Sequence, residues 1–160
     1  MNIFYFSYNV LLNARLLDDK RLIKMILETT QLLSNALFLH HKQNPYKPTH
    51  LRHPCTLWAS KTEGNWKWLK QYGIALSNEY TKRYNKEHKC YKILISMTCP
   101  KMKYKHFFQP PQCMPNQYKS RSATKAYIKY YIYEKYNPNL FKRASKSTLI
   151  FWKRQYRILI

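Results

Sequence analysis

The stretch Asp18–Leu39, DDKRLIKMILETTQLLSNALFL, decides the fold, because its apolar and polar residues separate onto two faces of a helix. The apolar residues that recur at helical spacing, and that we expect in the core, are Leu22, Ile26, Leu33 and Leu37. The polar residues on another face are Arg21, Lys24, Glu28, Gln31 and Asn35. Asp18 or Asp19 suits the N-cap, where a carboxylate accepts backbone N–H groups and meets the positive end of the helix dipole.

Glu28 is the unusual member of this polar face, since it is a mid-helix acid in a chain with only 7 Asp+Glu residues. Lys24 and Arg21 precede it by one and two helical turns. In one interpretation the face is solvated and Lys24 and Glu28 form an (i, i+4) pair. In the other, Glu28 is an active-site carboxylate at the bottom of a basic cleft. The residues alone leave both interpretations open.

Two more long helices are predicted downstream. The second runs from Trp66 to about Lys86, and Glu79 can pair there with Arg83 at (i, i+4). The third covers about 123–136 and begins after Ser122, a good N-cap residue. Pro-rich loops separate the helices at 40–54 and 100–119. The expected fold is therefore mainly α, a compact single-domain bundle of three long helices with long Pro-rich loops.

The shorter segments are less regular. Residues 1–8 are aromatic and β-prone, so they fit either a strand or an extended arm. Short helices are predicted at 10–16 and 55–60, and YKILISM at 91–97 fits a short strand. The tail at about 138–160 is a basic, aromatic segment that ends in FWKRQYRILI. No repeat or composition break divides the chain, so we expect one basic α-helical domain over residues 1–160.

The charge balance points to a polyanionic partner. The chain has 29 Lys+Arg against 7 Asp+Glu, a formal net charge of +22. An AT-rich genome would enrich Lys, Asn, Tyr and Ile but would not by itself deplete the acids. Double-stranded DNA is the expected partner. A membrane surface ranks second, because no basic amphipathic helix stands apart from the core.

Several classes of protein are excluded by composition. With only Gly64 and Gly73 present, a Gly-rich phosphate loop or dinucleotide fold is improbable. The start MNIFYFSYNVLL has neither the basic region nor the cleavage site of a signal peptide, and no apolar run is long enough to span a membrane. Four irregularly spaced cysteines suit reduced thiols, so we expect an intracellular protein, in the host cytoplasm or nucleus if it is viral. We also expect a monomer without a small-molecule cofactor.

Basic and aromatic residues alternate in the C-terminal part, where cations could bind phosphates and rings could stack on bases. The residues concerned are Lys125, Lys129, Tyr130, Tyr131, Lys135, Trp152, Lys153 and Arg154. The loop 47–54 adds further expected DNA contacts: Lys47, His50, Arg52 and His53. The plain alternative is that most tyrosines pack in the core and most lysines only solvate the surface. That alternative explains many single residues, but it does not explain the net charge of +22.

Metal binding is not predicted. His50, His53, Cys55, His88 and Cys90 are candidate zinc ligands, but their spacings do not match the paired ligands of structural zinc sites. No cluster of acids is present to hold magnesium.

Spacing reveals no Ser-His-Asp or Cys-His set, which leaves Glu28 and an amine as candidate catalytic groups. Opening an abasic sugar, or displacing a base from C1′, requires a nucleophilic amine and a carboxylate that transfers protons. An N-terminal amine has a pKa of about 8 and is partly neutral at physiological pH. A lysine whose pKa is lowered by neighbouring cations is the alternative.

Three segments carry a resemblance to a known family: LLDDKRLIKMILETTQLL at 16–33, the HP of THLRHPCTLWA at 49–59, and NWKWLKQYGIALSNEYTKRY at 65–84. They resemble the small phage-type pyrimidine-dimer DNA glycosylase/AP lyases, through related phage and viral proteins. The order of features is similar across most of the chain. The resemblance implies an all-α fold, a nucleotide flipped out of the duplex, and attack on C1′ by the N-terminal amine with help from a helix glutamate.

Glu28 matches that glutamate, nine residues after Asp19 in a D-x-x-L-x5-E frame. Arg21 stands where the family often has histidine, and Gln31 stands where an arginine helps to hold the substrate phosphate; with Lys24 they would position the sugar-phosphate. The family exposes a small residue after Met removal, whereas Asn2 is a poor substrate for that trimming. Either Met1 supplies the amine or the lyase chemistry is absent, so the candidate catalytic residues are Met1, Asn2 and Glu28.

The function expected from the residues and the resemblance is DNA repair by a glycosylase/AP lyase that acts on damaged or modified bases through a Schiff base. The alternative is a non-catalytic viral DNA-binding or packaging protein that uses the same charge and rings.

Overall fold

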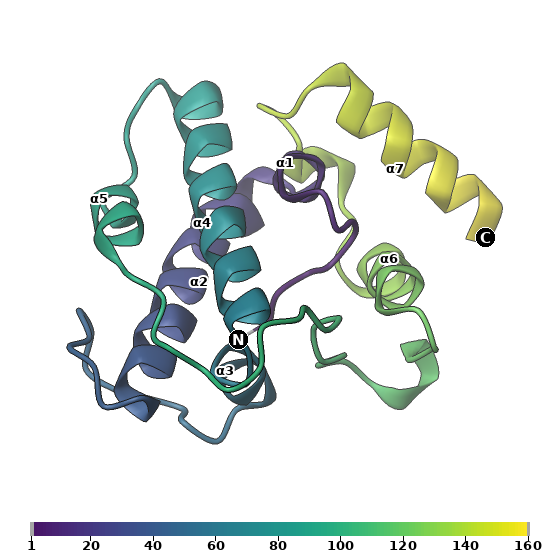
Figure 1. The fold of residues 1–160 in the computed structure, drawn as a ribbon. Coiled ribbons are helices and arrows are strands. Elements are labelled where there is room, and N and C mark those ends of the chain that lie inside the picture. Colours follow the sequence, from purple (N-terminus) through teal and green to yellow (C-terminus); the bar gives the residue numbers. More distant parts are fainter. Residues whose placement is uncertain (1, 160) are drawn as a thin grey trace.

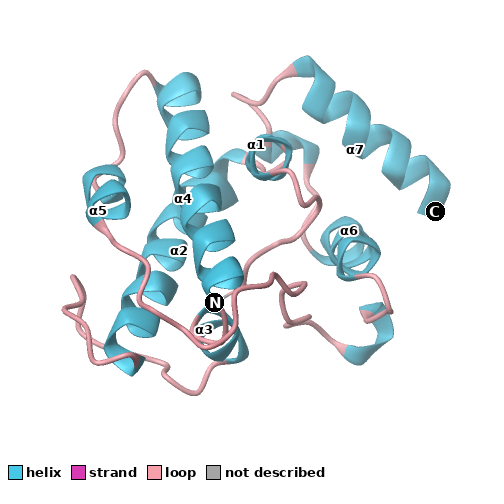
Figure 2. Ribbon diagram, viewed as in Figure 1, coloured by secondary structure: helices cyan, strands magenta, loops and turns pink. Residues whose placement is uncertain are grey.

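The computed structural model describes residues 2–159, and within this range the chain is helical with no strand (Figures 1 and 2). The α-helices are α1 Val10–Arg15, α2 Asp19–Leu39, α3 Pro54–Ala59, α4 Glu63–Tyr84, α5 Cys90–Ser96, α6 Ala123–Glu134 and α7 Lys146–Leu159. Single 3-10 turns lie at η1 Asn116–Tyr118 and η2 Pro138–Leu140. The mainly α class is confirmed, but the described part has more helices than the three long ones expected.

Helix α2 forms where the sequence predicted it. The Asp18 carboxylate accepts the Arg21 backbone N–H at 2.8 Å, so Asp18 is the N-cap. The four apolar residues predicted to face the core are all buried. Asn35 differs from the expectation of an outward polar face, because it is buried and its side chain donates to the Thr49 carbonyl at 2.7 Å. It therefore ties the loop after α2 to the helix.

Helices α2 and α4 form the centre of the fold, and α5 packs against both (Figure 1). Gly73 on α4 permits this close packing. A Cβ atom there would lie 2.9 Å from the Leu94 side chain on α5 and 3.0 Å from the Thr29 side chain on α2. The structure therefore shows that the small size of Gly73 is what the position requires.

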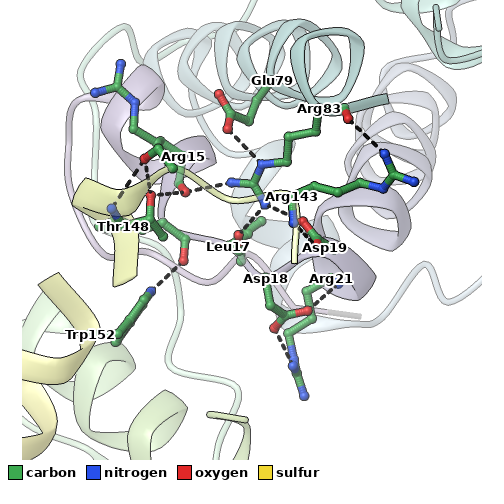
Figure 3. A network of polar contacts seen from close by, with 12 residues as sticks. Arg15, Leu17, Asp18, Asp19, Arg21, Glu79, Arg83, Arg143, Thr148 and Trp152 are labelled. Atoms are coloured by element: carbon green, nitrogen blue, oxygen red, sulfur yellow. Dashed lines mark hydrogen bonds and ion pairs between the residues drawn. The ribbon is translucent and has the colours of Figure 1, made fainter. Parts of the chain in front are cut away.

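Arg83, near the end of α4, joins three helices through one buried guanidinium (Figure 3). It pairs with Asp19 of α2 at 3.0 Å and with Glu79 of its own helix at 2.8 Å, which confirms the predicted (i, i+4) pair. It also donates to the carbonyls of Leu17 and Arg15, each at 2.8 Å. Apart from Glu79, these partners come from the region where α1 turns into α2, so Arg83 fixes the start of α2.

The C-terminal tail contains a fourth long helix, α7, which the sequence analysis treated only as a basic, aromatic segment. Its fully buried residues are Thr148 and Trp152, one helical turn apart. The Trp152 indole N–H donates to the Leu16 carbonyl at 2.7 Å (Figure 3). The Trp152 ring stacks on Tyr131 of α6 with centroids 4.6 Å apart. Leu149, Trp152, Tyr156 and Leu159 recur at helical spacing in this stretch, a signal for a helix that the sequence analysis did not use.

Residues 91–96 belong to helix α5, so the short strand expected at 91–97 is wrong. In α5 the buried residues are Cys90 and Leu94, four positions apart, which is a helical rather than an alternating pattern.

The N-terminal segment before α1 is an extended arm and not a strand. Asn13 holds it in place: its amide donates to the Phe4 carbonyl at 3.0 Å, and its oxygen accepts the Phe6 N–H at 2.6 Å. Phe4 has a φ of 47°, a left-handed conformation that is strained for a bulky residue. The Phe6 ring meets Tyr131 and Trp152 edge-on at 5.0 Å. The arm is therefore locked into the core in a defined path.

By length and composition alone, α2 is long and apolar enough to cross a membrane. However, 61% of its most apolar window is buried inside the protein. Core helices meet the same criteria, so this feature is weak evidence for a membrane span.

Candidate active site

Glu28 lies on α2 with its side chain only 12% exposed, and its two oxygens have different partners. One oxygen, Oε1, lies 3.2 Å from the ammonium of Lys24, whose side chain is 69% exposed. The other, Oε2, accepts the backbone N–H of Asn2 at 3.2 Å. The (i, i+4) pair therefore exists, but the carboxylate is not a solvated surface group, because it also faces the beginning of the chain.

A cavity of about 430 Å³ opens above this carboxylate. Its lining residues are Asn2, Phe4, Lys20, Arg21, Lys24, Met25, Glu28, Cys113, Tyr130 and Lys135. The cations in this lining come from both ends of the chain, and Glu28 is its only acid. The volume suits a small organic group, and the excess positive charge suits a ligand that carries phosphate.

Asn2 is held in the cavity by its own side chain. Its amide donates to the Cys113 carbonyl at 3.0 Å. The Tyr127 hydroxyl lies 2.6 Å from both the Asn2 side-chain oxygen and the Pro111 carbonyl, so one hydrogen is shared between two acceptors. Burial raises the pKa of Tyr127 well above its ordinary value, which keeps the hydroxyl protonated as a donor. Residue 2 is thus fixed beside Glu28.

Met1, the first candidate for the catalytic amine, lies outside the described residues 2–159. The first described residue is therefore Asn2, and its backbone nitrogen is the described atom nearest in sequence to the Met1 amine.

Of the residues expected to position the sugar-phosphate, Arg21 and Lys24 line the cavity and Gln31 does not. Arg21 is partly committed elsewhere, because its guanidinium pairs with the Asp18 carboxylate and lies 5.3 Å over the Tyr131 ring. The ammonium of Lys24 is the more accessible cation of the two.

The loop residues Lys47, His50 and Arg52 are exposed and lie outside this lining. His53 lines a second, open cavity of about 1060 Å³, which adjoins the first through their shared residue Cys113. His53 also caps α3, since its Nδ1 accepts the Cys55 N–H at 3.1 Å.

The structure contradicts base stacking on Tyr131 and Trp152, since both rings are fully buried and stack on each other in the core. Tyr130 is different: it is half-buried, lines the Glu28 cavity, and has the Lys135 ammonium 5.3 Å over its ring. Among the three aromatic residues expected to contact DNA, Tyr130 keeps an accessible face.

The remaining C-terminal cations are exposed on other surfaces. Lys125 and Lys129 line a groove between α6 and α7, and Lys153 and Arg154 lie on the outer side of α7. They contribute to the positive surface, and their contact with DNA stays a prediction.

The zinc ligands considered from sequence do not assemble as a set. The His88 ring accepts the Cys90 N–H at 3.2 Å, and this pair lies apart from the group formed by His53 and Cys55. Within the described chain, the third member of that group is Cys113, a residue that sequence spacing could not reveal. A hydrogen bond with the Cys55 thiol lowers the pKa of Cys113 to about 7.

Sequence reasoning also missed Lys20 and Tyr127, and it counted Lys135 only among the C-terminal basic residues, not with Glu28. Lys20 directly follows the helix start and could have been placed on the same face as Lys24 by its spacing of four. Tyr127 and Lys135 reach the site only because α6 folds back onto the N-terminal arm, for which the sequence has no local signal.

These features define a class: an all-helical, strongly basic protein whose N-terminal arm meets a helix glutamate in a cation-lined cavity. The family model described as pyrimidine dimer DNA glycosylase matches residues 1–92, more than half of the chain, and the chain belongs to this family. Membership implies DNA as the substrate. No curated protein and no solved structure matches the chain.

The matched region contains the arm, α2, the loop with His53 and Pro54, and α4. It therefore includes Asn2, Glu28 and Lys24. Residues 93–160 lie outside the match but complete the cavity with Cys113, Tyr130 and Lys135.

Proposed function

We propose that the protein is a monomeric DNA glycosylase/AP lyase that acts on damaged or modified bases in duplex DNA through a Schiff base with its N-terminal amine. The observation that carries this proposal is the 3.2 Å approach of the Asn2 nitrogen to Glu28 Oε2. It supports a site in which an amine at the start of the chain and a carboxylate act on the same sugar carbon.

In the proposed reaction, the amine nitrogen attacks C1′ and the glycosidic bond breaks. The base leaves with the bonding electron pair and takes up a proton. Glu28 accepts the proton that the amine loses and assists opening of the sugar ring to the imine. Loss of a C2′ proton then expels the 3′ phosphate, and water hydrolyses the imine to restore the amine. This chemistry requires no cofactor.

The cations around the cavity would act in two ways. Lys20, Lys24 and Lys135 line the cavity, and they would bind the phosphates on either side of a flipped nucleotide. Their positive charge also disfavours protonation of a nearby amine, which keeps a larger neutral fraction available for attack.

Two residues remain candidates for the amine. If Met1 is removed, the Asn2 nitrogen is itself the amine and already lies within hydrogen-bonding distance of Glu28. If Met1 is retained, this nitrogen is an amide and Met1 carries the nucleophile.

Borohydride trapping on duplex DNA with one abasic site tests the proposal. Reduction should fix the protein covalently to the DNA, and mass spectrometry of the N-terminal peptide should locate the sugar on Met1 or Asn2. A version with extra residues before Met1 should bind DNA but lose trapping. Binding without any trapped adduct would contradict the proposal and favour the non-catalytic DNA-binding alternative.

A further inference from the structure

Two thiols and an imidazole meet beside the Glu28 cavity. The sulfurs of Cys55 and Cys113 lie 3.5 Å apart although the residues are 58 positions apart in sequence. A ring nitrogen of His53 joins them, and the three ligand atoms all lie within 4.8 Å of one another. Cys55 is buried, and the other two are half-buried.

The sulfur separation suits shared coordination of one ion. In a tetrahedral zinc site with Zn–S bonds of about 2.3 Å, two sulfurs lie roughly 3.8 Å apart. A disulfide would need about 2.05 Å between the sulfurs, much less than the distance observed here. Thiolate and imidazole ligands favour zinc-type ions over magnesium or calcium, which prefer oxygen.

Local structure holds the ligands in place before any ion binds. His53 and Cys55 lie at the start of α3, where the Pro54 ring fixes the turn. On the other side, the Cys113 N–H donates to the Pro111 carbonyl at 3.1 Å, and the Cys113 carbonyl accepts from Asn2. The His53 ring caps α3 through Nδ1, so an ion bound at Nδ1 would replace that hydrogen bond, whereas an ion bound at Nε2 would leave it in place.

We propose that His53, Cys55 and Cys113 bind one zinc-type divalent ion, with its fourth coordination position towards the open cavity that His53 and Cys113 line. Such an ion would join α3 to the loop that carries Cys113. Because Cys113 also holds Asn2, the ion would stabilise the arm beside Glu28. Its role is structural, so it does not depend on the proposed glycosylase reaction.

The test uses the full chain with Zn²⁺ and Co²⁺ as probes. Reduced protein that is incubated with Zn²⁺ and dialysed should retain about one ion per chain, and two of its four cysteines should become protected from a thiol reagent. Co²⁺ should produce a thiolate-to-cobalt charge-transfer band. Cys113→Ser and Cys55→Ser should lose stoichiometric metal and the band. Cys99→Ser is the matched control, because Cys99 is also half-buried but lies outside the cluster.

The thiol-protection measurement on the unaltered protein keeps the test valid if a variant fails to fold. The proposal is overturned if reduced wild-type protein retains no Zn²⁺, if Cys113→Ser retains one ion, or if Cys99→Ser loses it. Borohydride trapping on the same samples separates the two proposals. Metal binding without trapping would contradict only the glycosylase proposal, and trapping without metal would contradict only this one.

Discussion

At the scale of single residues, Glu28 can be tested by one change of charge. Glu28→Gln keeps the side-chain shape, and loss of the pair with the exposed Lys24 should cost well under about 1 kcal/mol of stability. Turnover on abasic duplex DNA should fall by about 100-fold or more if the carboxylate transfers protons. DNA affinity should hold or rise, because a negative charge leaves a site that faces phosphates. Single-turnover cleavage and binding titrations measure both effects.

Glu63→Gln is the matched control for that change. Glu63 also forms an (i, i+4) pair, with Lys67 at 2.9 Å, but it lies outside the Glu28 cavity. The Glu63→Gln variant should cleave abasic DNA at the wild-type rate. Equal cleavage rates for wild type and Glu28→Gln would show that Glu28 has only a structural role.

Tyr127 is a positioning residue, since it touches Asn2 rather than the expected substrate. Tyr127→Phe removes the hydroxyl that lies 2.6 Å from the Asn2 side chain and the Pro111 carbonyl. The Asn2 oxygen keeps the Ile3 N–H at 2.8 Å and the Pro111 carbonyl keeps the Cys113 N–H at 3.1 Å, so losing the hydroxyl should cost only about 0.5–1.5 kcal/mol of stability. Below its melting temperature, the folded variant should bind DNA normally but form the trapped adduct more slowly.

Tyr133→Phe provides the comparison, because the Tyr133 hydroxyl also donates to a carbonyl, that of Leu159, but on the exposed surface. It should leave the trapping rate unchanged. If both variants trap at the wild-type rate, Tyr127 has no part in positioning the arm.

How well the sequence revealed each site residue depended on whether the signal was local. Glu28 could be singled out because a mid-helix acid among basic residues is visible within one stretch. Tyr127 could not, because it meets Asn2 across 125 positions and looks like any other tyrosine of α6. Tyr131 and Trp152 were assigned to DNA for the same reason, since composition does not separate a buried ring from an exposed one.

At the scale of helices, Trp152 anchors α7 in the core, whereas Tyr130 faces the Glu28 cavity from α6. Replacing Trp152 should therefore lower stability, and replacing Tyr130 should lower DNA affinity. Trp152→Ala should cost about 3–5 kcal/mol of stability, because it empties a fully buried site. Tyr130→Ala should instead weaken DNA binding by about 1–3 kcal/mol if a base or sugar stacks there. Thermal melts and binding titrations on both variants measure this contrast. A Tyr130→Ala variant that melts early but binds normally would show that the ring serves only packing.

At the start of α5, His88 should make stability depend on pH. Burial lowers its pKa from 6.5, and its Nδ1 accepts the Cys90 N–H. As pH falls below 6.5, the unfolded chain binds a proton at His88 before the folded chain does, and this lowers the free energy of unfolding. The loss is complete once pH has fallen below the folded-state pKa of His88. His88→Asn should flatten the acid side of a plot of unfolding free energy against pH. An unchanged slope would mean that other groups control it.

The three long helices that the sequence located all begin after a residue whose side chain accepts a backbone N–H. Asp18 and Ser122 each accept a backbone N–H at the start of α2 and α6, as expected of N-cap residues. Helix α7 also has apolar residues at helical spacing, and the sequence analysis missed it because it treated the tail only as a basic, aromatic segment. Helix α5 is short, with Cys90 and Leu94 as its buried residues, and it is stabilised by packing against α2 and α4.

Across the whole molecule, most acids are already committed to internal contacts. Ion pairs engage Asp18, Asp19, Glu28, Glu63 and Glu79. Glu134 accepts a hydrogen bond from Tyr118. Few acids are therefore left to neutralise the other lysines and arginines, which carry the formal charge of +22. This arrangement favours non-specific attraction to a polyanion, with the Glu28 cavity as the place where chemistry would occur.

This charge distribution predicts steeply salt-dependent binding to duplex DNA with little sequence preference. Each neutralised phosphate should contribute about −0.9 to the slope of log K against log salt concentration. If Lys20 and Lys135 bind phosphates at the cavity, Lys20→Gln and Lys135→Gln should each reduce the slope by about one. Lys42→Gln is the control, because Lys42 is also exposed but lies beyond the opposite end of α2, in a different cavity. Titrations at several salt concentrations measure the slope. A wild-type slope near zero would refute electrostatic binding, and equal slopes for the three variants would show that the duplex does not sit over the Glu28 cavity.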